Sequence, residues 1–399
     1  MPKALDVFMV AGEPSGDLSA SLVAACLRDA GATLRGAAGP LMRAAGVEPL
    51  FPSESWGTMG LGDSLRRVPL LYRRMRQLAA SLVAEPPDVL VLVDFGAFNV
   101  RLARRVRRAR PELPILYYFP PSSWDPRPRD RSWLAPLVDA VATPFAHSAR
   151  LLQQDGVPAV WVGHPVLDRL APVTDRAEFR RRHDLPAGAP VIGLMPGSRA
   201  LERKCLSRPL LETVKWLAPR LPEARFLWSV LPQGPRVAAD AEALRLPGVQ
   251  GVADSATLLS AADLVITAMG TATLEAAAVD CLPLTVYRGN AAMWLQWKLT
   301  DLGTDLYAMP NILLGEKVIP ELVHREVKAA RLGAEVLEVW GDPRRQAQLH
   351  EALGRVRAAL GTPGASQRTA EMILRLGRGE PLPVGIEPTR LQTEDMTNI

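Results

Sequence analysis

The chain of 399 residues is 48% hydrophobic and 22% charged, the balance of a globular protein, which excludes a disordered or fibrous one. Its formal net charge of +5 favours anionic partners, such as a phosphorylated substrate or an anionic membrane surface, and no nucleic-acid motif accompanies it. The three scattered cysteines exclude a disulfide framework, and we predict no metal site built from the protein's own side chains.

The start of the sequence does not resemble a signal peptide, because Met1-Pro2-Lys3 leads into a short strand and then into a polar turn. No stretch reaches the ~20 apolar residues that span a bilayer. We therefore expect a cytoplasmic protein.

Short apolar strands alternate with helices through the first part of the chain. We expect strands over residues 7–11, 89–94, 114–118, 138–142 and 159–162, and helices over 18–30, 41–45 and 101–110. Such alternation predicts a parallel sheet with helices on both faces, which binds its ligands at the carboxyl ends of the strands.

The polar, Arg-rich segment 168–185 is predicted to be a linker with one helix, after which the alternation starts again. We expect strands over 190–195, 225–231, 264–267 and 282–286, a helix over 206–217, and mainly helical sequence from 291 to the mid-370s. The sequence therefore predicts an α/β protein of two doubly wound domains, 1–167 and 168–360, facing each other across a cleft, with a disordered tail over 379–399.

A polar turn bounded by glycines follows the first strand. It is neither a GxGxxG motif nor a Walker loop, which argues against a dinucleotide or nucleoside-triphosphate site of the standard kinds. Because glycine lacks a side chain, its backbone can approach a sugar closely. The candidate binding residues here are Gly12, Glu13, Ser15, Gly16 and Asp17. The alternative is that Ser15 or Asp17 only caps the following helix.

Asp94 closes the Val-rich strand and should therefore lie in the cleft, where a carboxylate can take a proton from a sugar hydroxyl. The alternative for Asp94 is a cap or a loop anchor. Asn99 is expected to be a cap, and the lone His164 is expected to be structural.

Two further turns follow strands in the second half. Ser198 and Arg199 follow the strand 190–195, and an arginine fork there can bind phosphate oxygens, although a surface arginine is the alternative. Gly270 and Thr271 follow the strand 264–267 and open a helix, whose N-terminus suits phosphates. Glu275, one turn further, could accept hydrogen bonds from ribose hydroxyls. The alternative is an ordinary strand-to-helix turn.

Segments 66–76 and 101–110 are rich in arginine. The first mixes Leu70, Leu71, Tyr72 and Met75 with its cations, which suits shallow seating on an anionic membrane. For the second we prefer a solvated helix face.

Taken together, these motifs resemble the lipid-A-disaccharide synthase family over about residues 5–376. The resemblance rests on segments 11–17, 38–42, 59–60, 94–99, 162–165, 196–202, 270–275, 287–288, 310–313 and 364–366, which occur in the family's order. Each motif is weak alone, and the set is specific.

The resemblance implies a GT-B fold of two Rossmann-like domains, with a C-terminal helix over 361–378 packed back on the first. It implies an inverting glycosyltransferase without cofactor or required metal, which transfers 2,3-diacylglucosamine from its UDP derivative to lipid X. Asp94 inherits the role of general base, Arg199 a place near the phosphates, and Glu275 and Asn311 contacts with the nucleotide. The implied location is peripheral, at the inner face of the cytoplasmic membrane, and a homodimer is left open.

The sequence departs from the family pattern at several points. Ala97 replaces a second aspartate, and Met269 replaces a serine. The family's Ser-Pro-Ser-Val-Trp-Ala-Trp run is Pro-Pro-Ser-Ser-Trp-Asp-Pro over 120–126, and Ala146 replaces a glutamate. Most changes fall in the acceptor domain, which leaves two alternatives open: an enzyme like UDP-N-acetylglucosamine 2-epimerase, or a divergent member with another acceptor or no catalysis.

Overall fold

The structure is a computed structural model of the chain, and it describes residues 4–53, 56, 61–173, 175–182, 184–186, 188–231, 237–289 and 305–382. The side chains of residues 61–67 are outside this description. The family motif at 59–60 and the predicted disordered tail, apart from its first residues, also lie outside the described residues.

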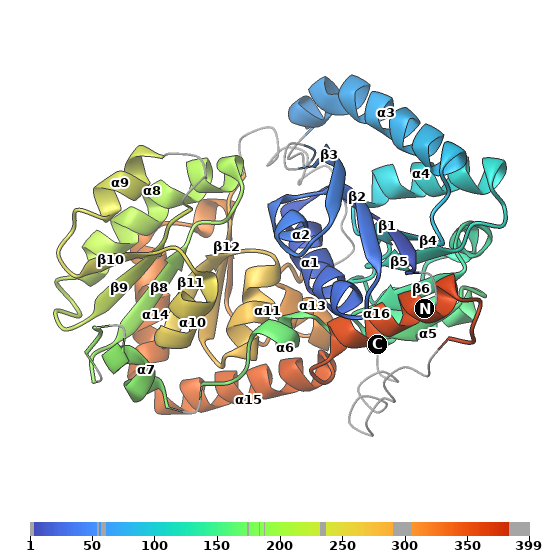
Figure 1. The fold of residues 1–399 in the computed structure, drawn as a ribbon. Coiled ribbons are helices and arrows are strands. Elements are labelled where there is room, and N and C mark those ends of the chain that lie inside the picture. Colours follow the sequence, from blue (N-terminus) through green and yellow to red (C-terminus); the bar gives the residue numbers. More distant parts are fainter. Residues whose placement is uncertain are drawn as a thin grey trace. The chain divides into compact units, whose positions relative to one another are not determined.

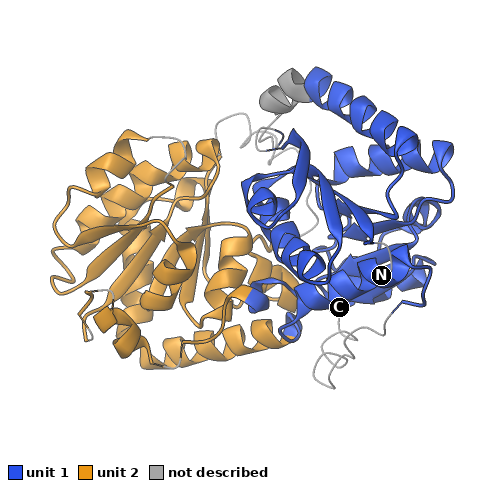
Figure 2. Ribbon diagram, viewed as in Figure 1, with its two compact units in different colours: residues 1–168, 359–399 blue, residues 169–358 orange. Residues whose placement is uncertain are grey.

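The chain divides into two compact units (Figure 2). Unit 1 comprises residues 1–168 and 359–399, and unit 2 comprises residues 169–358. The chain therefore crosses from unit 1 to unit 2 and back again, so that its C-terminal part belongs with its N-terminal part. The predicted cleft between the two units stays a prediction.

Unit 1 is built on a seven-stranded parallel sheet (Figure 1). Its strands are β1 (Asp6–Ala11), β2 (Thr33–Ala38), β3 (Glu48–Pro52), β4 (Val89–Val93), β5 (Ile115–Tyr118), β6 (Ala140–Thr143) and β7 (Ala159–Trp161). They lie in the order β3-β2-β1-β4-β5-β6-β7. This is the Rossmann order with one strand added, and the order reverses between β1 and β4.

Helices cover both faces of the sheet of unit 1. They are α1 (Pro14–Asp29), α2 (Pro40–Ala44), α3 (Leu61–Ala84), α4 (Gly96–Ala109), η1 (Ser132–Leu137), α5 (Ala146–Gln154), α6 (Val166–Arg169) and α16 (Ala365–Gly377). One hydrophobic cluster joins α3 and α4 to the sheet, and a second joins α1, α2 and α16 to its other face. The carboxylate of Asp168 accepts hydrogen bonds from the backbone N–H groups of Gly364 and Ser366, which fixes the start of α16 in this unit.

Unit 2 repeats this architecture with six strands. They are β8 (Val191–Met195), β9 (Arg225–Ser229), β10 (Val249–Val252), β11 (Leu264–Ala268), β12 (Leu282–Tyr287) and β13 (Glu321–Val323), in the order β10-β9-β8-β11-β12-β13, all parallel. The order reverses between β8 and β11, as it does between β1 and β4 in unit 1. The predicted α/β fold of two Rossmann-like domains is therefore confirmed.

The helical elements in the described part of unit 2 are α7 (Arg176–Arg182), α8 (Ala200–Leu217), α9 (Ala238–Ala243), α10 (Ser255–Ala261), α11 (Thr271–Ala278), α13 (Met309–Leu314), η2 (His324–Glu326), α14 (Ala329–Gly341) and α15 (Pro343–Ala359). The segment 168–185 holds α7 and the end of α6. It therefore contains helical residues at two places, where the sequence predicted one helix.

Four strands escaped the sequence prediction: β2, β3, β10 and β13. Three of them are short edge strands, and β3 carries two prolines, which an edge tolerates because it need not donate every ladder hydrogen bond. β2 is internal but contains Gly36, a poor strand former. At φ 151°, Gly36 lies so close to Met9 that an added Cβ would collide with the Met9 carbonyl, so glycine is needed there.

Candidate active site

The candidate site of unit 1 lies where its strand order reverses. β1 and β4 pair in parallel with Ala11 opposite Val93, so the segments that follow them start side by side at one edge of the sheet. These segments begin with Gly12 and Asp94. Open parallel sheets bind ligands at this reversal, at the carboxyl ends of the strands.

The structure brings two of the predicted glycine-turn residues to Asp94 and a third to the next residue, Phe95. Ser15 Oγ lies 3.5 Å from Asp94 Oδ2, and a Cβ on Gly16 would lie 3.6 Å from Asp94 Cβ. Gly12 faces the Phe95 ring so closely that a Cβ there would lie 2.3 Å from it. The lack of a side chain at Gly12 thus lets the β1 turn and the β4 turn pack together.

The segment predicted as a polar loop is partly helical. Pro14 occupies the first turn of α1, where its missing N–H costs nothing, so Ser15, Gly16 and Asp17 are helical residues. Glu13 is the N-cap residue of α1, and its side chain makes no capping hydrogen bond. The helix therefore begins earlier than the sequence predicted.

Asp17 caps a different helix from the one that contains it. Its buried carboxylate accepts hydrogen bonds from the N–H groups of Leu41 and Met42, both at 3.0 Å, at the start of α2. The alternative prediction for Asp17 was that it caps the helix that follows the turn, α1. This is wrong, because the helix that Asp17 caps is α2. We assign Asp17 to the support of the site, because these contacts occupy its carboxylate.

The loop after β5 carries the departures from the family pattern, and a buried aspartate organises it. Asp125 accepts hydrogen bonds from Arg127 and pairs with Arg129, and burial alone would raise its pKa, but these cations outweigh burial and lower it. Arg131 donates to the Asp125 carbonyl. The ion pairs leave the neighbouring Trp124 side chain 44% exposed on a well-fixed loop.

This loop is also tied to neighbouring elements. His147 Nε2 donates to the Ser123 carbonyl at 3.1 Å, and burial lowers the pKa of His147 to about 4, so the ring is neutral at physiological pH. Pro121 packs on Gly96, two residues after Asp94, where a Cβ on the glycine would lie 2.9 Å from the proline ring. The loop therefore lies beside the start of α4.

His164 is structural, as the sequence predicted. Its Nδ1 accepts the N–H of Val166 at 3.1 Å, and its ring packs between Phe119 and Phe145. Burial lowers its pKa to about 3, against the raising effect of Asp168, so the ring stays neutral and accepts this hydrogen bond.

In unit 2, two predicted turns lie at the reversal between β8 and β11. The β8 turn has Gly197 at φ 103°, a left-handed conformation that favours glycine. Ser198 and Arg199 are exposed at this turn, and Glu202 accepts hydrogen bonds from both the backbone N–H and the guanidinium of Arg199 at 3.2 Å. α8 begins directly after Arg199, earlier than predicted.

Arg203 holds the Gly197 turn in place through a hydrogen bond. It is 1% exposed, its Nε pairs with Asp240 at 3.0 Å, and it donates to the carbonyls of Gly197 and Ser229. A buried guanidinium is stable only with such partners. The Gly197 turn is therefore positioned by an ion pair that connects α8 with α9.

The β11 turn opens α11 in the predicted way. Gly270 is the N-cap residue at φ 132°, and a Cβ there would meet no atom within 4 Å, so the space beside it is open to a ligand. Thr271 is the exposed first residue of the helix, which presents unpaired backbone N–H groups. Glu275 is buried and pairs with Arg169 at 3.1 Å.

The Asn311 side chain hydrogen-bonds to the backbone of a neighbouring loop and so supports the fold. It is fully buried, its Oδ1 accepts the N–H groups of Val318 and Ile319, and its Nδ2 donates to the Ile319 carbonyl. These bonds close the loop before β13 and occupy the side chain. We therefore leave Asn311 out of the proposed nucleotide contacts.

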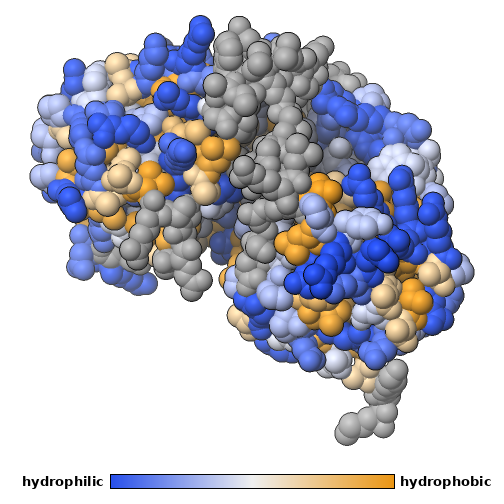
Figure 3. All heavy atoms as spheres, turned by 90° about the horizontal axis from the view of Figure 1, so that it is seen from above, coloured by the Kyte–Doolittle hydropathy of each residue, from blue (hydrophilic) through white to orange (hydrophobic). Residues whose placement is uncertain are grey.

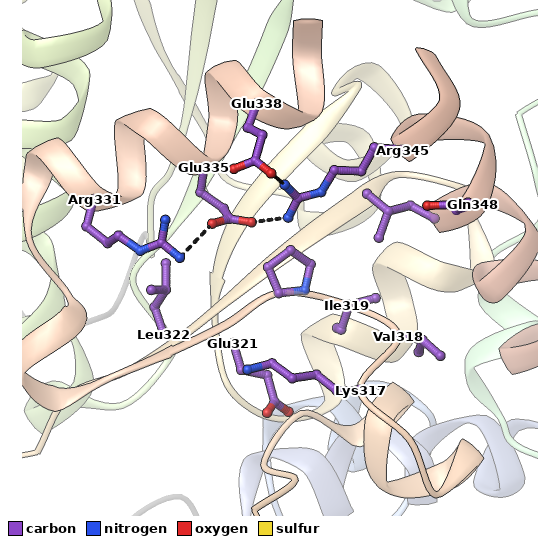
Figure 4. A pocket seen from close by; sticks show the side chains of 12 residues that line it. Lys317, Val318, Ile319, Glu321, Leu322, Arg331, Glu335, Glu338, Arg345 and Gln348 are labelled. Carbon is purple, nitrogen blue, oxygen red and sulfur yellow. Dashed lines mark hydrogen bonds and ion pairs between the residues drawn. The ribbon is translucent and has the colours of Figure 1, made fainter. Parts of the chain in front are cut away.

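A pocket of about 410 Å³ lies elsewhere in unit 2, between α14, α15 and the loop before β13 (Figure 4). Four of its charged lining residues pair with one another: Glu335 pairs with Arg331 and Arg345, and Arg345 also pairs with Glu338. None of the predicted site residues lines it. We interpret these pairs as the joint that holds α15 against α14.

Four residues that support the site escaped the sequence prediction of function. Arg169 and Arg203 pair with Glu275 and Asp240, and Tyr117 and Asn99 hold the Asp94 backbone. Each partner is distant in sequence or lies across a turn, so composition and spacing give no signal. Asn99 alone was singled out, as a cap, and this prediction was wrong, because Phe95 is the N-cap residue of α4 and Asn99 Nδ2 donates to the carbonyls of the preceding turn.

Among the described residues, no group of three or more His, Cys, Asp or Glu side chains is placed to hold a metal ion. No helix in the described part of the chain is long and apolar enough to cross a bilayer.

Relatives that match nearly the whole chain carry the same name, lipid-A-disaccharide synthase. The chain is 33% identical over 378 residues to the lipid-A-disaccharide synthase of Geobacter sulfurreducens, covering 93% of this chain and 97% of that one. It is 30% identical over 388 residues to the enzyme of the same name from Synechocystis, covering 94% and 98%.

Solved structures share the fold at low sequence identity. A putative UDP-N-acetylglucosamine 2-epimerase from Listeria monocytogenes superimposes with a TM-score of 0.65 at 13% identity, covering 96% of this chain and 100% of that one. MurG of Acinetobacter baumannii gives a TM-score of 0.59 at 16% identity, covering 94% and 100%. These likenesses support the fold.

The sequence model of the lipid-A-disaccharide synthetase family matches residues 7–373, and the chain therefore belongs to this glycosyltransferase family.

Proposed function

We propose that this protein transfers 2,3-diacylglucosamine from its UDP derivative to lipid X with inversion at the anomeric carbon, giving the lipid A disaccharide 1-phosphate and UDP. The observation that carries the proposal is the family match over residues 7–373. The epimerase alternative is supported only by structural likeness at 13% identity, which reaches the fold and not the reaction.

The donor diphosphate is assigned to the strand-order reversal of unit 2. The unpaired N–H groups at Gly270 and Thr271 and the guanidinium of Arg199 follow the neighbouring strands β11 and β8. A helix N-terminus and an arginine both attract phosphate oxygens. Exposed Ser198 offers a hydroxyl at the same turn, and Glu275 is assigned to the ribose.

The acceptor hydroxyl is assigned to unit 1, beside Asp94. The Asp94 carboxylate takes the proton of the acceptor hydroxyl. At the same time the hydroxyl oxygen forms a bond to the anomeric carbon of the donor sugar, and the bond from that carbon to the diphosphate breaks. The electron pair leaves with UDP, whose added charge is stabilised by Arg199 and the α11 N-terminus. Gly12, Glu13, Ser15 and Gly16 are assigned to the acceptor sugar, with Asp17 supporting them from below.

A transfer assay tests this proposal. The purified protein is incubated with UDP-2,3-diacylglucosamine and lipid X, and the products are examined by mass spectrometry. We expect a disaccharide 1-phosphate with equimolar UDP. A UDP-sugar epimer formed without any acceptor would favour the alternative activity, and no turnover of either kind would favour a non-catalytic binder.

Glu275→Gln tests the donor assignment. Removing the charge should raise the Kd for UDP about tenfold or more, because a hydrogen bond to a charged group contributes about 1.5–3 kcal/mol. Isothermal titration calorimetry measures it, with Glu242→Gln as the control, since Glu242 pairs with exposed cations on α8. Equal UDP affinity in both variants would remove Glu275 from the site.

We place the enzyme at the inner face of the cytoplasmic membrane through α3. Val68, Leu70 and Tyr72 are exposed large hydrophobics, and Arg73 and Arg76 are exposed nearby on the same helix. The prediction was wrong for Met75, which is buried in the core, and for Leu71, which packs against it. On the described part of the face drawn in Figure 3, hydrophobic residues form small groups among hydrophilic ones. Apolar side chains next to cations suit an anionic lipid surface.

Leu70→Asp should lower binding to phosphatidylglycerol-containing vesicles about tenfold, because burying one leucine contributes about 1.5–3 kcal/mol. Leu244→Asp is the matched control, since both leucines are exposed, at 40% each, and Leu244 lies in unit 2. Vesicle co-sedimentation measures the effect. The same loss in both variants would argue against α3 as the contact.

A further inference from the structure

The backbone at the end of β4 is unusual. Asp94 has φ 48° and Phe95 has φ 49°, so two consecutive residues other than glycine are left-handed. Aspartate visits this region more easily than most residues, but phenylalanine does so rarely, and each such residue costs on the order of 1–3 kcal/mol. A strained pair persists only where its surroundings hold it.

Two buried side chains donate hydrogen bonds to the same backbone atom of this turn, the carbonyl oxygen of Asp94. The Tyr117 hydroxyl donates to the Asp94 carbonyl at 2.9 Å, and Asn99 Nδ2 donates to the same carbonyl at 2.9 Å and to the Val93 carbonyl at 3.1 Å. Tyr117 lies on β5, the strand next to β4, and Asn99 lies in the first turn of α4. The carbonyl is therefore fixed by both elements beside the turn.

Both donors are fully buried, and the hydroxyl of Tyr117 is always available as a donor. Burial, and then the charge of Asp94, raise the pKa of Tyr117 well above its usual value, so the hydroxyl keeps its proton. Among the described residues, Asn99 Oδ1 has no hydrogen-bond partner, whereas Nδ2 has two acceptors. The amide is thus oriented by the carbonyls of the turn.

We propose that Tyr117 and Asn99 are positioning residues, which hold the left-handed turn and thereby direct the Asp94 carboxylate at the acceptor hydroxyl. This inference rests on the proposed role of Asp94 as general base. A carboxylate at the end of a turn swings with its backbone, and a shift of about 1 Å can cost up to 10²-fold in rate. Neither residue touches the substrate in this account, so both act through Asp94.

Tyr117→Phe is the cleanest test, because it removes one hydroxyl and leaves the ring in its hydrophobic cluster. We expect kcat to fall about tenfold, the effect of losing one hydrogen bond. The KM for both substrates and the Kd for UDP should stay unchanged. A purely structural role would instead lower the melting temperature and leave kcat per folded molecule intact.

Tyr118→Phe is the matched control. Tyr118 is the next residue of β5, equally buried, and packs in the cluster on the other face of the sheet. Both variants remove one buried hydroxyl, but among the described residues the Tyr118 hydroxyl has no hydrogen-bond partner, so Tyr118→Phe should lower the melting temperature less than Tyr117→Phe does. Only Tyr117→Phe should lose turnover, and equal kcat in the two variants would overturn the inference.

A double-mutant cycle separates this inference from the proposed function. In an Asp94→Asn background, Tyr117→Phe should cost nothing further, because it acts only through the carboxylate. The same tenfold loss in both backgrounds would overturn the positioning role. If Asp94→Asn alone keeps full kcat, the general-base assignment fails instead.

Discussion

Replacing Asp94 by asparagine should lower kcat by roughly 10²–10⁴-fold, the contribution of a positioned general base. Asparagine is the informative substitution, because it tolerates the left-handed backbone at φ 48° as well as aspartate does. Alanine at this position would combine the loss of the carboxylate with backbone strain. Steady-state transfer kinetics with both lipid substrates measure the effect.

Two controls accompany this variant. UDP binding, assigned to unit 2, should match that of the unsubstituted protein by calorimetry, and the melting temperature should change little. Ser15→Ala removes the hydroxyl 3.5 Å from the Asp94 carboxylate and should have a smaller effect, since this contact is long for a hydrogen bond. Turnover near the normal rate in Asp94→Asn would exclude this residue as the base.

Replacing Asp240 by asparagine should destabilise unit 2 by about 3–5 kcal/mol, the cost of leaving a buried charge without its partner. Arg203 is 1% exposed and its Nε pairs with Asp240, so it would keep its charge in a nearly dry site. The substitution conserves shape, so a cavity does not explain the loss. Chemical denaturation of the full chain, followed by tryptophan fluorescence, measures it.

The same helix supplies the control. Glu242→Gln breaks exposed pairs with Arg208 and Lys215, and surface pairs contribute about 0–1 kcal/mol. Asp240→Asn should also weaken UDP binding, because Arg203 donates to the Gly197 carbonyl in the β8 turn. An unfolding midpoint shared by both variants would show that the Arg203 pair contributes no more than a surface pair.

Much of the architecture could be predicted from the sequence because its central strands are short and almost wholly apolar. β4, β8 and β11 are buried at every residue, so their composition alone marks them. The turns that follow them carry Asp94, Arg199 and Gly270, and strand ends in such sheets carry function. Strand order could not be predicted, because no local pattern records which strands pair.

Roles within the site were harder to predict, because the same residue type can bind a ligand or hold the scaffold. Asp17 caps α2, a helix 24 residues further along the chain, and Asn311 closes a loop. Both resembled ligand contacts in sequence. Buried backbone groups need hydrogen-bond partners, and a polar side chain that bonds to them is no longer available to a ligand. Only folding brings these backbone groups to the side chain.

The sequence by itself determined the class of fold, the residue types at the strand-end turns and the family. The tertiary structure alone decided which side chains support those turns: Tyr117 and Asn99 at Asp94, and Arg203 at Gly197. The physical reason is one of range. Backbone preference and hydrophobic periodicity act between neighbours in the chain, whereas hydrogen bonds and ion pairs in a parallel sheet join residues that only the crossover connections bring together.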